Sequence, residues 1–327
     1  MSRHLTENGY QNTPPLLGHV QRQRGGGEAC ALMIVQGFIR NQGDGWDHSQ
    51  DVLARLTDSV AVTSGSGEDA TDQFAGYLNF AAAVGRRLAE LHAVLARPSA
   101  APAFAPKAAS AADTKRLAEE VKTQLDAALA AIDGVQDWPD PTAATDARRL
   151  RGQAKALRRA IDLLCAGVAG ALQTRIHGDF HLGQVLVVQG DAYLIDFEGE
   201  PARPLDERRA KASPLRDVAG MVRSLDYARA VAMPSRASLT PQVAERRAAL
   251  LDRFHNESVA AFLGAYRVAH AEAEYKWATP AMEPALLDLF LLQKAAYEVC
   301  YEAANRLSWL PVPLRGLAEL ADRMTHE

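Results

Sequence analysis

Three oxygen-bearing side chains, Asp179, Gln184 and Asp196, stand at the two ends of a short apolar segment. Residues 177–184 read HGDFHLGQ, and VLVV, QGD and AYLI then lead to DFEGE at 196–200. Phosphoryl transfer to a hydroxyl group requires one carboxylate to orient the hydroxyl and accept its proton, and oxygen ligands to hold Mg²⁺ on nucleotide phosphates. We therefore expect Asp179 to be the catalytic base and Gln184 and Asp196 to be metal ligands.

The plain alternative for this segment is a tight surface turn in which His177 and Asp179 serve only as caps. An HGD sequence alone would favour that alternative. Here the apolar runs at 185–188 and 192–195 predict a hairpin, and a second acidic segment follows it. Motif and structural context therefore agree, and this agreement favours the catalytic interpretation.

The elements around this segment are predicted to be mostly helical. Residues 14–20 and 30–35 form apolar runs that predict a β-hairpin, with a turn at 24–28. An Ala/Pro-rich stretch at 97–109 is typical of a linker. Apolar residues at helical spacing predict helices at 72–96, 113–132, 144–172, 214–231, 242–270, 280–306 and 313–324.

Composition excludes several classes of protein. Lys and Arg number 36 against 40 Asp and Glu, so no net basic field draws in nucleic acid. The one dense basic run, at 148–159, is interpreted as the solvated face of a helix. Three distant cysteines make neither a disulfide framework nor a zinc site. No stretch is apolar enough to span a bilayer and no signal peptide is evident, so we expect a cytoplasmic protein without a membrane partner.

The segment from His177 to Ala228 resembles the kinase-like phosphotransferases related to aminoglycoside and choline kinases. More narrowly it resembles the bacterial maltokinases, because of Gln184, FEGEPARPL at 197–205 and SPLRDVAGM at 213–221. Most members of the superfamily have Asn in place of Gln184. The resemblance runs from about residue 14 to residue 318. It implies an α+β, protein-kinase-like fold with a mainly helical large lobe and a truncated β small lobe.

The resemblance also implies a reaction. Family members use ATP and Mg²⁺ to phosphorylate the anomeric hydroxyl of maltose, giving maltose 1-phosphate for glycogen and α-glucan synthesis. Asp179 matches the base, and Gln184 and Asp196 match the metal ligands. His177 is expected to support the catalytic loop, and His181 to line the acceptor site or brace the loop. Glu198 either contacts a second metal or has a structural role.

Further site residues follow from the resemblance. Gln36 and Phe38 match the hinge between lobes, where backbone groups would hold adenine; a buried strand end is the rival interpretation. Asp217 opens a predicted helix and matches the aspartate that stiffens the catalytic loop. A first-turn carboxylate that favours the helix dipole is equally compatible.

A third set of residues recurs at spacings of three and four, which places them on one helix face: Lys294, Tyr297, Glu298 and Tyr301. Hydrogen-bonding groups and aromatic rings suit a disaccharide, and the resemblance places maltose against this helix. The alternative is an amphipathic helix whose tyrosines reach solvent.

The predicted domains are a remnant of the small lobe and hinge at 1–45 and the helical large lobe at 46–327. No GxGxxG loop or Lys-bearing strand precedes Pro14, so we expect most of the small lobe to be lacking. The chain is then a maltokinase completed by an upstream-encoded small-lobe chain, or a catalytically weak sugar-binding remnant that acts with trehalose synthase. A kinase for another hydroxyl, such as that of an aminoglycoside or choline, is the third possibility.

Overall fold

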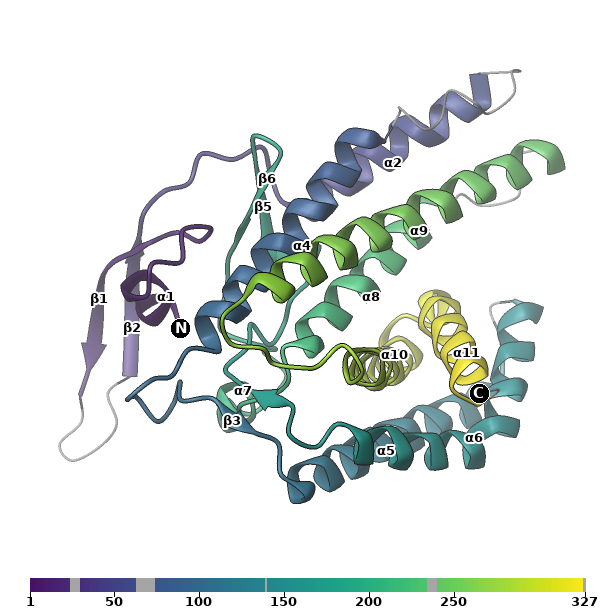
Figure 1. The fold of residues 1–327 in the computed structure, drawn as a ribbon. Helices are drawn as coiled ribbons and strands as arrows, with labels where there is room; N and C mark the ends of the chain where they lie inside the picture. The colour runs from purple at the N-terminus through teal and green to yellow at the C-terminus, as the bar shows by residue number, and fades with distance from the viewer. Residues whose placement is uncertain (24–29, 63–73, 139, 234–239, 326–327) are drawn as a thin grey trace. The chain divides into compact units, whose positions relative to one another are not determined.

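The computed structural model describes residues 1–23, 30–62, 74–138, 140–233 and 240–325, so the turn predicted at 24–28 lies outside it (Figure 1). The chain forms two compact units. The first comprises Met1–Arg97, His177–Arg209 and Val231–Tyr275, and the second comprises Pro98–Ile176, Ala210–Ala230 and Lys276–Glu327. This division does not follow the expected boundary at residue 45, because residues 1–45 share a unit with the predicted catalytic hairpin.

The first unit combines long helices with two short hairpins. Its elements are α1 (Ser2–Glu7), β1 (Leu16–Arg22), β2 (Cys30–Gln36), α2 (Gly45–Val62), α4 (Ala75–Leu95), the 3₁₀ helix η2 (Leu182–Gln184), β5 (Val185–Val188), β6 (Asp191–Leu194), α7 (Leu205–Arg209) and α9 (Pro241–Glu272). The predicted strands and the helices over 72–96 and 242–270 are confirmed within the described residues. Helices α1, α2 and α7 were not predicted.

The core of the first unit lies between α4 and α9. Gly85 permits their close approach, since a Cβ at this position would lie 2.1 Å from the Phe262 carbonyl oxygen. His92 Nδ1 and the Tyr266 hydroxyl lie 2.9 Å apart in the buried contact between the two helices. Leu88, Leu91 and Phe262 are buried around them. The hairpin β5–β6 packs against this helix pair, because α4 also contacts β6.

The β1–β2 hairpin is antiparallel and has little cover. Its register runs from Leu16 opposite Gln36 to Arg22 opposite Cys30, with two register shifts. Met33 and Ile34 pair in register with Val20 and His19, and consecutive residues of a strand point to opposite faces, so they lie on different sides of the sheet. They are 56% and 48% exposed, and neither face is therefore covered.

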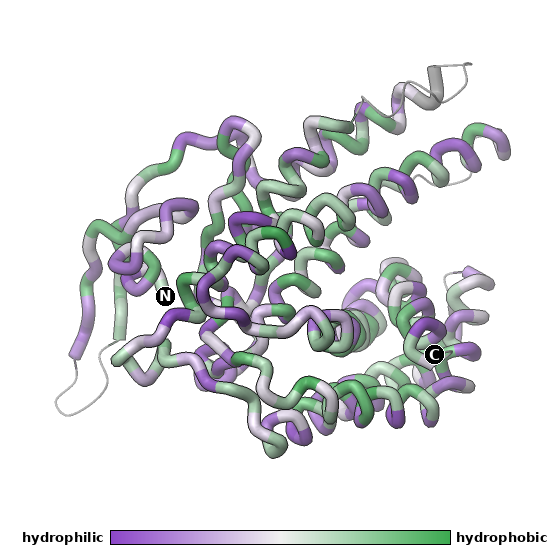
Figure 2. The backbone as a smooth tube through the Cα atoms, viewed as in Figure 1, coloured by the Kyte–Doolittle hydropathy of each residue, from purple (hydrophilic) through white to green (hydrophobic). Residues whose placement is uncertain are grey.

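The second unit is a helical assembly. Its elements are β3 (Lys107–Ala108), α5 (Ala111–Asp133), α6 (Pro141–Gly167), β4 (Leu172–Gln173), nearly all of α8 (Leu215–Ala232), α10 (Glu283–Asn305), the 3₁₀ helix η4 (Leu307–Trp309) and α11 (Pro311–Thr325). Ser110 and Asp113 form a capping box at the start of α5, and Asp140 caps α6 before Pro141. Along α5 and α6 hydrophobic and hydrophilic stretches alternate, as one buried face requires (Figure 2).

The basic run at 148–159 is a solvated helix face, as predicted. Arg149 pairs with Asp146 and Asp322, and Arg158 pairs with Asp126. The mainly helical α+β prediction also holds, since the described residues form long helices and three two-stranded sheets. In the part of the chain that the structure describes, no helix has the length and hydropathy needed to cross a membrane.

Candidate active site

The hairpin β5–β6 owes its geometry to its turn and its alternating pattern. Gln189 and Gly190 both have positive φ, 51° and 80°, which is the backbone of a two-residue type I′ turn. Val185 pairs with Leu194 across the strands, and both are completely buried. The hairpin therefore has one face in the core and can present residues at its open end.

Segments far away in the sequence fix this hairpin on both edges. The Leu194 N–H donates to the Asn12 carbonyl at 2.8 Å, on the β6 side. On the β5 side the Gln42 N–H donates to the Val187 carbonyl at 2.9 Å, and the Val187 N–H donates to the Gly43 carbonyl at 3.0 Å. The N-terminal part of the chain thus extends the two-stranded sheet and holds its register.

His177 holds the predicted catalytic loop against the end of β6. This buried ring places Nε2 2.8 Å from the Ile195 carbonyl, and its Nδ1 accepts the Asp179 N–H at 3.4 Å. These partners define a neutral ring with the proton on Nε2. The ring packs against Phe180 and Phe197, with centroids 5.2 and 5.1 Å away. These are the contacts of a supporting residue, since both nitrogens are engaged with backbone groups.

Asp179, Gln184 and Asp196 approach one another around the imidazole of His181. Asp179 Oδ2 lies 4.0 Å from His181 Nε2, and the Gln184 amide nitrogen lies 3.5 Å from the same atom. That amide nitrogen also lies 3.3 Å from Asp196 Oδ2. The three side chains that the sequence singled out are therefore brought together in one cluster.

His181 has the contacts of a loop brace, one of its two expected roles. Its Nδ1 accepts the Gly183 N–H at 3.1 Å and so caps η2, which carries Gln184. In the neutral ring Nε2 then carries the proton, and this nitrogen lies 4.0 Å from Asp179 Oδ2, beyond hydrogen-bond distance. One imidazole thus braces the loop and lies beside the predicted base.

The amide of Gln184 and the carboxylate of Asp196 form a donor set that suits Mg²⁺. Because His181 Nε2 is a donor, turning the Gln184 amide by half a turn would give it an acceptor and place Gln184 Oε1 beside Asp196 Oδ2. Two neighbouring oxygens of this kind fit a hard cation. Among the described residues no group of three or more His, Cys, Asp or Glu is arranged for a metal. A cation here would take its remaining ligands from phosphate oxygens and water.

Three residues around the cluster have a backbone in the region of positive φ. Asp196 has φ of 61°, in the left-handed region, and Gly178 and Gly199 have φ of 88° and 73°. Glu198 is exposed two residues beyond Asp196. The chain thus turns sharply on both sides of the cluster, where it must present side chains rather than continue a strand.

The expected hinge lies directly after β2. Gln36 ends the strand opposite Leu16, and the next N–H, that of Gly37, donates to the Pro15 carbonyl at 2.9 Å. The side chain of Phe38 is 89% exposed, so the alternative of a buried strand end does not hold for it. The adenine-binding role of Gln36 and Phe38 stays a prediction.

The predicted sugar-binding residues belong to the second unit, on α10. Lys294 Nζ lies 5.1 Å from the ring centroid of Tyr297, and Tyr301 is 46% exposed. Glu298 is only 8% exposed, and its Oε2 accepts from Arg223 Nε at 2.8 Å. The four residues therefore do not present one common open face, because Glu298 is engaged inside its unit.

Asp217 also belongs to the second unit. It is buried in the first turn of α8, and its N–H donates to the Pro214 carbonyl at 3.1 Å. This position fits the helix-dipole interpretation. Its expected support of the catalytic loop stays a prediction.

Sequence comparison identifies relatives but no family model. No family model matches the chain. A glucosamine kinase of Streptacidiphilus jiangxiensis is 28% identical over 295 residues, which are 90% of this chain and 59% of that protein. A glucosamine kinase of Mycolicibacterium smegmatis is 28% identical over 325 residues, 98% of this chain and 70% of the relative. The chain thus spans about three fifths of the first relative's length.

Solved structures give the same result for the fold. A glucosamine kinase in complex with glucosamine, ADP and inorganic phosphate matches 97% of this chain and 66% of its own, with a TM-score of 0.75 and 25% identity. A second crystal of a glucosamine kinase matches 98% of this chain and 65% of its own, also with a TM-score of 0.75. The chain is therefore similar in fold to glucosamine kinases, and these relatives do not support the narrower maltokinase assignment.

Proposed function

We propose that the chain carries the catalytic loop of an ATP-dependent sugar kinase. The single observation behind this proposal is the meeting of Asp179, Gln184 and Asp196 around His181. The similarity to glucosamine kinases supports the same class of reaction. In this proposal Asp179 accepts the proton of the attacked hydroxyl, while Gln184 and Asp196 hold the metal.

The protein's own contribution is positioning. The Asp179 side chain is 21% exposed, which leaves its carboxylate open to a hydroxyl, and His181 Nε2 lies 4.0 Å from it. His177 fixes the Asp179 backbone relative to the end of β6. A base held in this way contributes about 10²–10⁴-fold to the rate of such reactions.

Bound Mg²⁺ would neutralise charge on the nucleotide phosphates. Gln184 and Asp196 are the residues that would hold it. The Gln184 amide nitrogen lies 3.3 Å from Asp196 Oδ2, so the two side chains are close enough to share one cation. ATP is then the co-substrate, with Gln36 and Phe38 as the proposed hinge.

Glucosamine is the first acceptor to test, because the relatives are glucosamine kinases. Maltose is the second, on the maltokinase-like motifs and on one feature of α10. Two of the α10 carboxylates are already paired, Glu298 with Arg223 and Glu302 with Arg306. An amino sugar would find no unpaired carboxylate among these two, whereas Lys294 and the tyrosines Tyr297 and Tyr301 suit neutral hydroxyls.

The test is sugar-dependent ADP release with Mg-ATP and a panel of glucosamine, maltose, choline and an aminoglycoside. We expect turnover of a sugar that falls by about 100-fold or more in Asp179→Asn. The matched control is Asp206→Asn, which alters an exposed carboxylate in α7. Equal turnover in wild type and Asp179→Asn would contradict the proposal.

The alternative is a sugar-binding protein with weak or no turnover, acting with trehalose synthase or a separate small-lobe chain. It predicts that calorimetry detects sugar binding while no ADP is released by the chain alone. Restored turnover on adding a candidate partner would then assign the missing function to that partner.

A further inference from the structure

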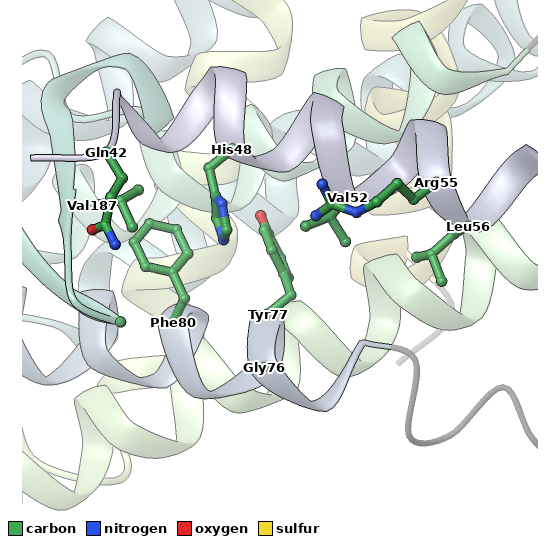
Figure 3. Close-up of a pocket in the computed structure, with 10 residues that line it drawn as sticks. Gln42, His48, Val52, Arg55, Leu56, Gly76, Tyr77, Phe80 and Val187 are labelled. Carbon is green, nitrogen blue, oxygen red and sulfur yellow. The ribbon is translucent and has the colours of Figure 1, made fainter.

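A cavity of about 570 Å³ lies in the first unit between α2, α4 and the turn of β5–β6 (Figure 3). Its aromatic rings already pack on one another, since Tyr77 and Phe80 both contact His48 and are only 3% and 1% exposed. These rings offer no free face to a ligand. A charged group whose head is not engaged in this way lies beside the proposed catalytic loop instead, at Arg208 in α7.

Two glycines bring the proposed catalytic loop and the loop after β6 into contact. Gly178 directly precedes Asp179 and has φ of 88°. Gly199 follows shortly after Asp196 and has φ of 73°. A Cβ at Gly178 would lie only 3.4 Å from the Gly199 Cα. The backbone of Gly199 therefore rests against the loop that carries the proposed base.

The side chain of Arg208 lies along the space that Gly199 leaves open. A Cβ at Gly199 would lie 3.3 Å from Arg208 Cβ, 3.5 Å from its Cγ and 3.6 Å from its Cδ. Arg208 is half-buried, and its Nε is fully buried without a hydrogen-bond partner among the described residues. The guanidinium is thus held against the protein close to Gly199 rather than extended into solvent.

The charge of Arg208 has no counter-ion within the described ranges of the chain. The neighbouring carboxylates of Glu200 and Glu207 are both bound by Arg203, at 3.2 and 3.5 Å. A buried donor that lacks a partner is costly, so a ligand that accepts a hydrogen bond from it is stabilised there. A guanidinium binds phosphate through two parallel N–H···O bonds, which makes phosphate the ligand that this group suits.

We propose that Arg208 binds the γ-phosphate of ATP and stays on it while the phosphoryl group is transferred. This inference rests on the proposed kinase function, in which Gln184 and Asp196 hold the metal on the nucleotide phosphates. In that reaction the bond from the γ-phosphorus to the oxygen shared with the β-phosphate breaks, a bond to the sugar oxygen forms, and the hydroxyl proton goes to Asp179. Negative charge is spread over the γ-phosphate oxygens throughout, and a preorganised guanidinium stabilises it.

The experiment is calorimetric titration of the full chain, in the presence of Mg²⁺, with ADP and with the non-hydrolysable β,γ-imido analogue of ATP. Arg208→Met keeps an unbranched apolar chain over Gly199 and removes the guanidinium. We expect it to weaken binding of the analogue by about 10-fold or more and to leave ADP binding unchanged, because only the analogue carries a γ-phosphate. Arg208→Lys keeps the charge but not the planar fork, and should recover only part of the loss.

Arg209→Met is the matched control, because Arg209 is the exposed neighbour of Arg208 in the same helix. It should bind both nucleotides as the wild type does, and thermal unfolding checks that each variant is folded. Unchanged analogue binding in Arg208→Met, or equal losses for the two nucleotides, would overturn this inference and leave the proposed kinase function standing. A wild type that binds neither nucleotide below about 1 mM would contradict both.

Discussion

The hairpins β5–β6 and β1–β2 belong to the same unit and are both two-stranded and antiparallel, yet their surroundings differ. In β5–β6, Val185, Val187 and Leu194 are buried, and both edges bond to backbone from residues 12 and 42–43. In β1–β2, Met33 and Ile34 are exposed on opposite faces. Two strands alone are marginal in water, so packing rather than strand pairing gives β5–β6 the rigidity that a catalytic cluster needs.

The largest difference in the free energy of unfolding is expected between two Leu→Ala substitutions, one placed in each hairpin. Leu194→Ala removes a completely buried side chain from β6, which should lower the free energy of unfolding by about 2–5 kcal/mol. Leu32→Ala, at a position 63% exposed, should change it by less than about 0.5 kcal/mol. Urea unfolding measures both. Similar losses in the two variants would break the comparison and mean that β1–β2 is covered in solution.

The contact of α2 with the proposed catalytic loop should be almost as sensitive to substitution. A Cβ on Gly45 would lie 2.9 Å from the Leu182 carbonyl oxygen and 3.3 Å from Phe80 Cζ. Gly45→Ala should therefore cost about 1–3 kcal/mol. Gly76→Ala is the control, since its Cβ meets open space and the helix gains about 0.5–1 kcal/mol. Equal stability of the two variants would show that α2 does not press on the loop.

A third prediction concerns the ion pair that ties β6 to α4. Arg87 donates to both carboxylate oxygens of Asp191, from Nε at 2.9 Å and from an Nη at 2.5 Å. Arg87→Met should cost about 1 kcal/mol near neutral pH, because the pair is partly exposed. Arg86→Met, at the exposed neighbouring position, is the matched control.

The same pair gives a pH dependence. Burial alone would raise the pKa of Asp191, but hydrogen bonds from Arg87 and the Ala192 N–H outweigh it and lower the pKa below 3.8. The unfolded chain therefore binds this proton first as the pH falls, and the stabilisation present above pH 3.8 is lost toward the lower, folded pKa. Acid unfolding curves of wild type and Arg87→Met should converge in that range. A constant gap would contradict the assignment.

The smallest expected effect is a difference between two cysteines in their rate of chemical labelling, which tests their exposure directly. Cys30 is exposed on β2, whereas Cys165 is buried in α6, and burial raises its thiol pKa to about 12. Iodoacetamide at pH 8 should label Cys30 first and leave Cys165 unlabelled until the protein unfolds. Mass spectrometry of the labelled peptides identifies the site. Labelling of Cys165 at the rate of Cys30 would contradict this exposure difference.

Local sequence patterns predicted the hairpin β5–β6 and its polar ends, because alternation and turn residues act over a few positions. The bond of Asn12 to β6 and the closeness of Gly45 to Leu182 join residues more than 130 positions apart, and no local pattern encodes them. Helix α2 was missed because its first residues, GWDHSQD, are typical of a turn. Its buried pair Leu53 and Leu56 was the available signal.

The grouping of the candidate site residues was predicted in part. Spacing and the family resemblance selected Asp179, Gln184 and Asp196, but the bridging position of His181 depends on its rotamer and on the η2 turn. On α10 the same reasoning grouped Glu298 with Lys294, although Glu298 is paired with Arg223 from α8. Helical spacing gives a shared face but not the partner that covers it.

The left-handed backbone of Asp196 decides how its chemistry should be probed. Asn tolerates this conformation nearly as well as Asp, whereas Ala adds a conformational penalty of about 1 kcal/mol or more. Asp196→Asn therefore removes the negative charge and leaves the chain path intact, while Asp196→Ala changes both at once. Only the asparagine variant separates the loss of a cation ligand from a displacement of the loop. A glycine variant keeps the left-handed backbone but removes both carboxylate oxygens.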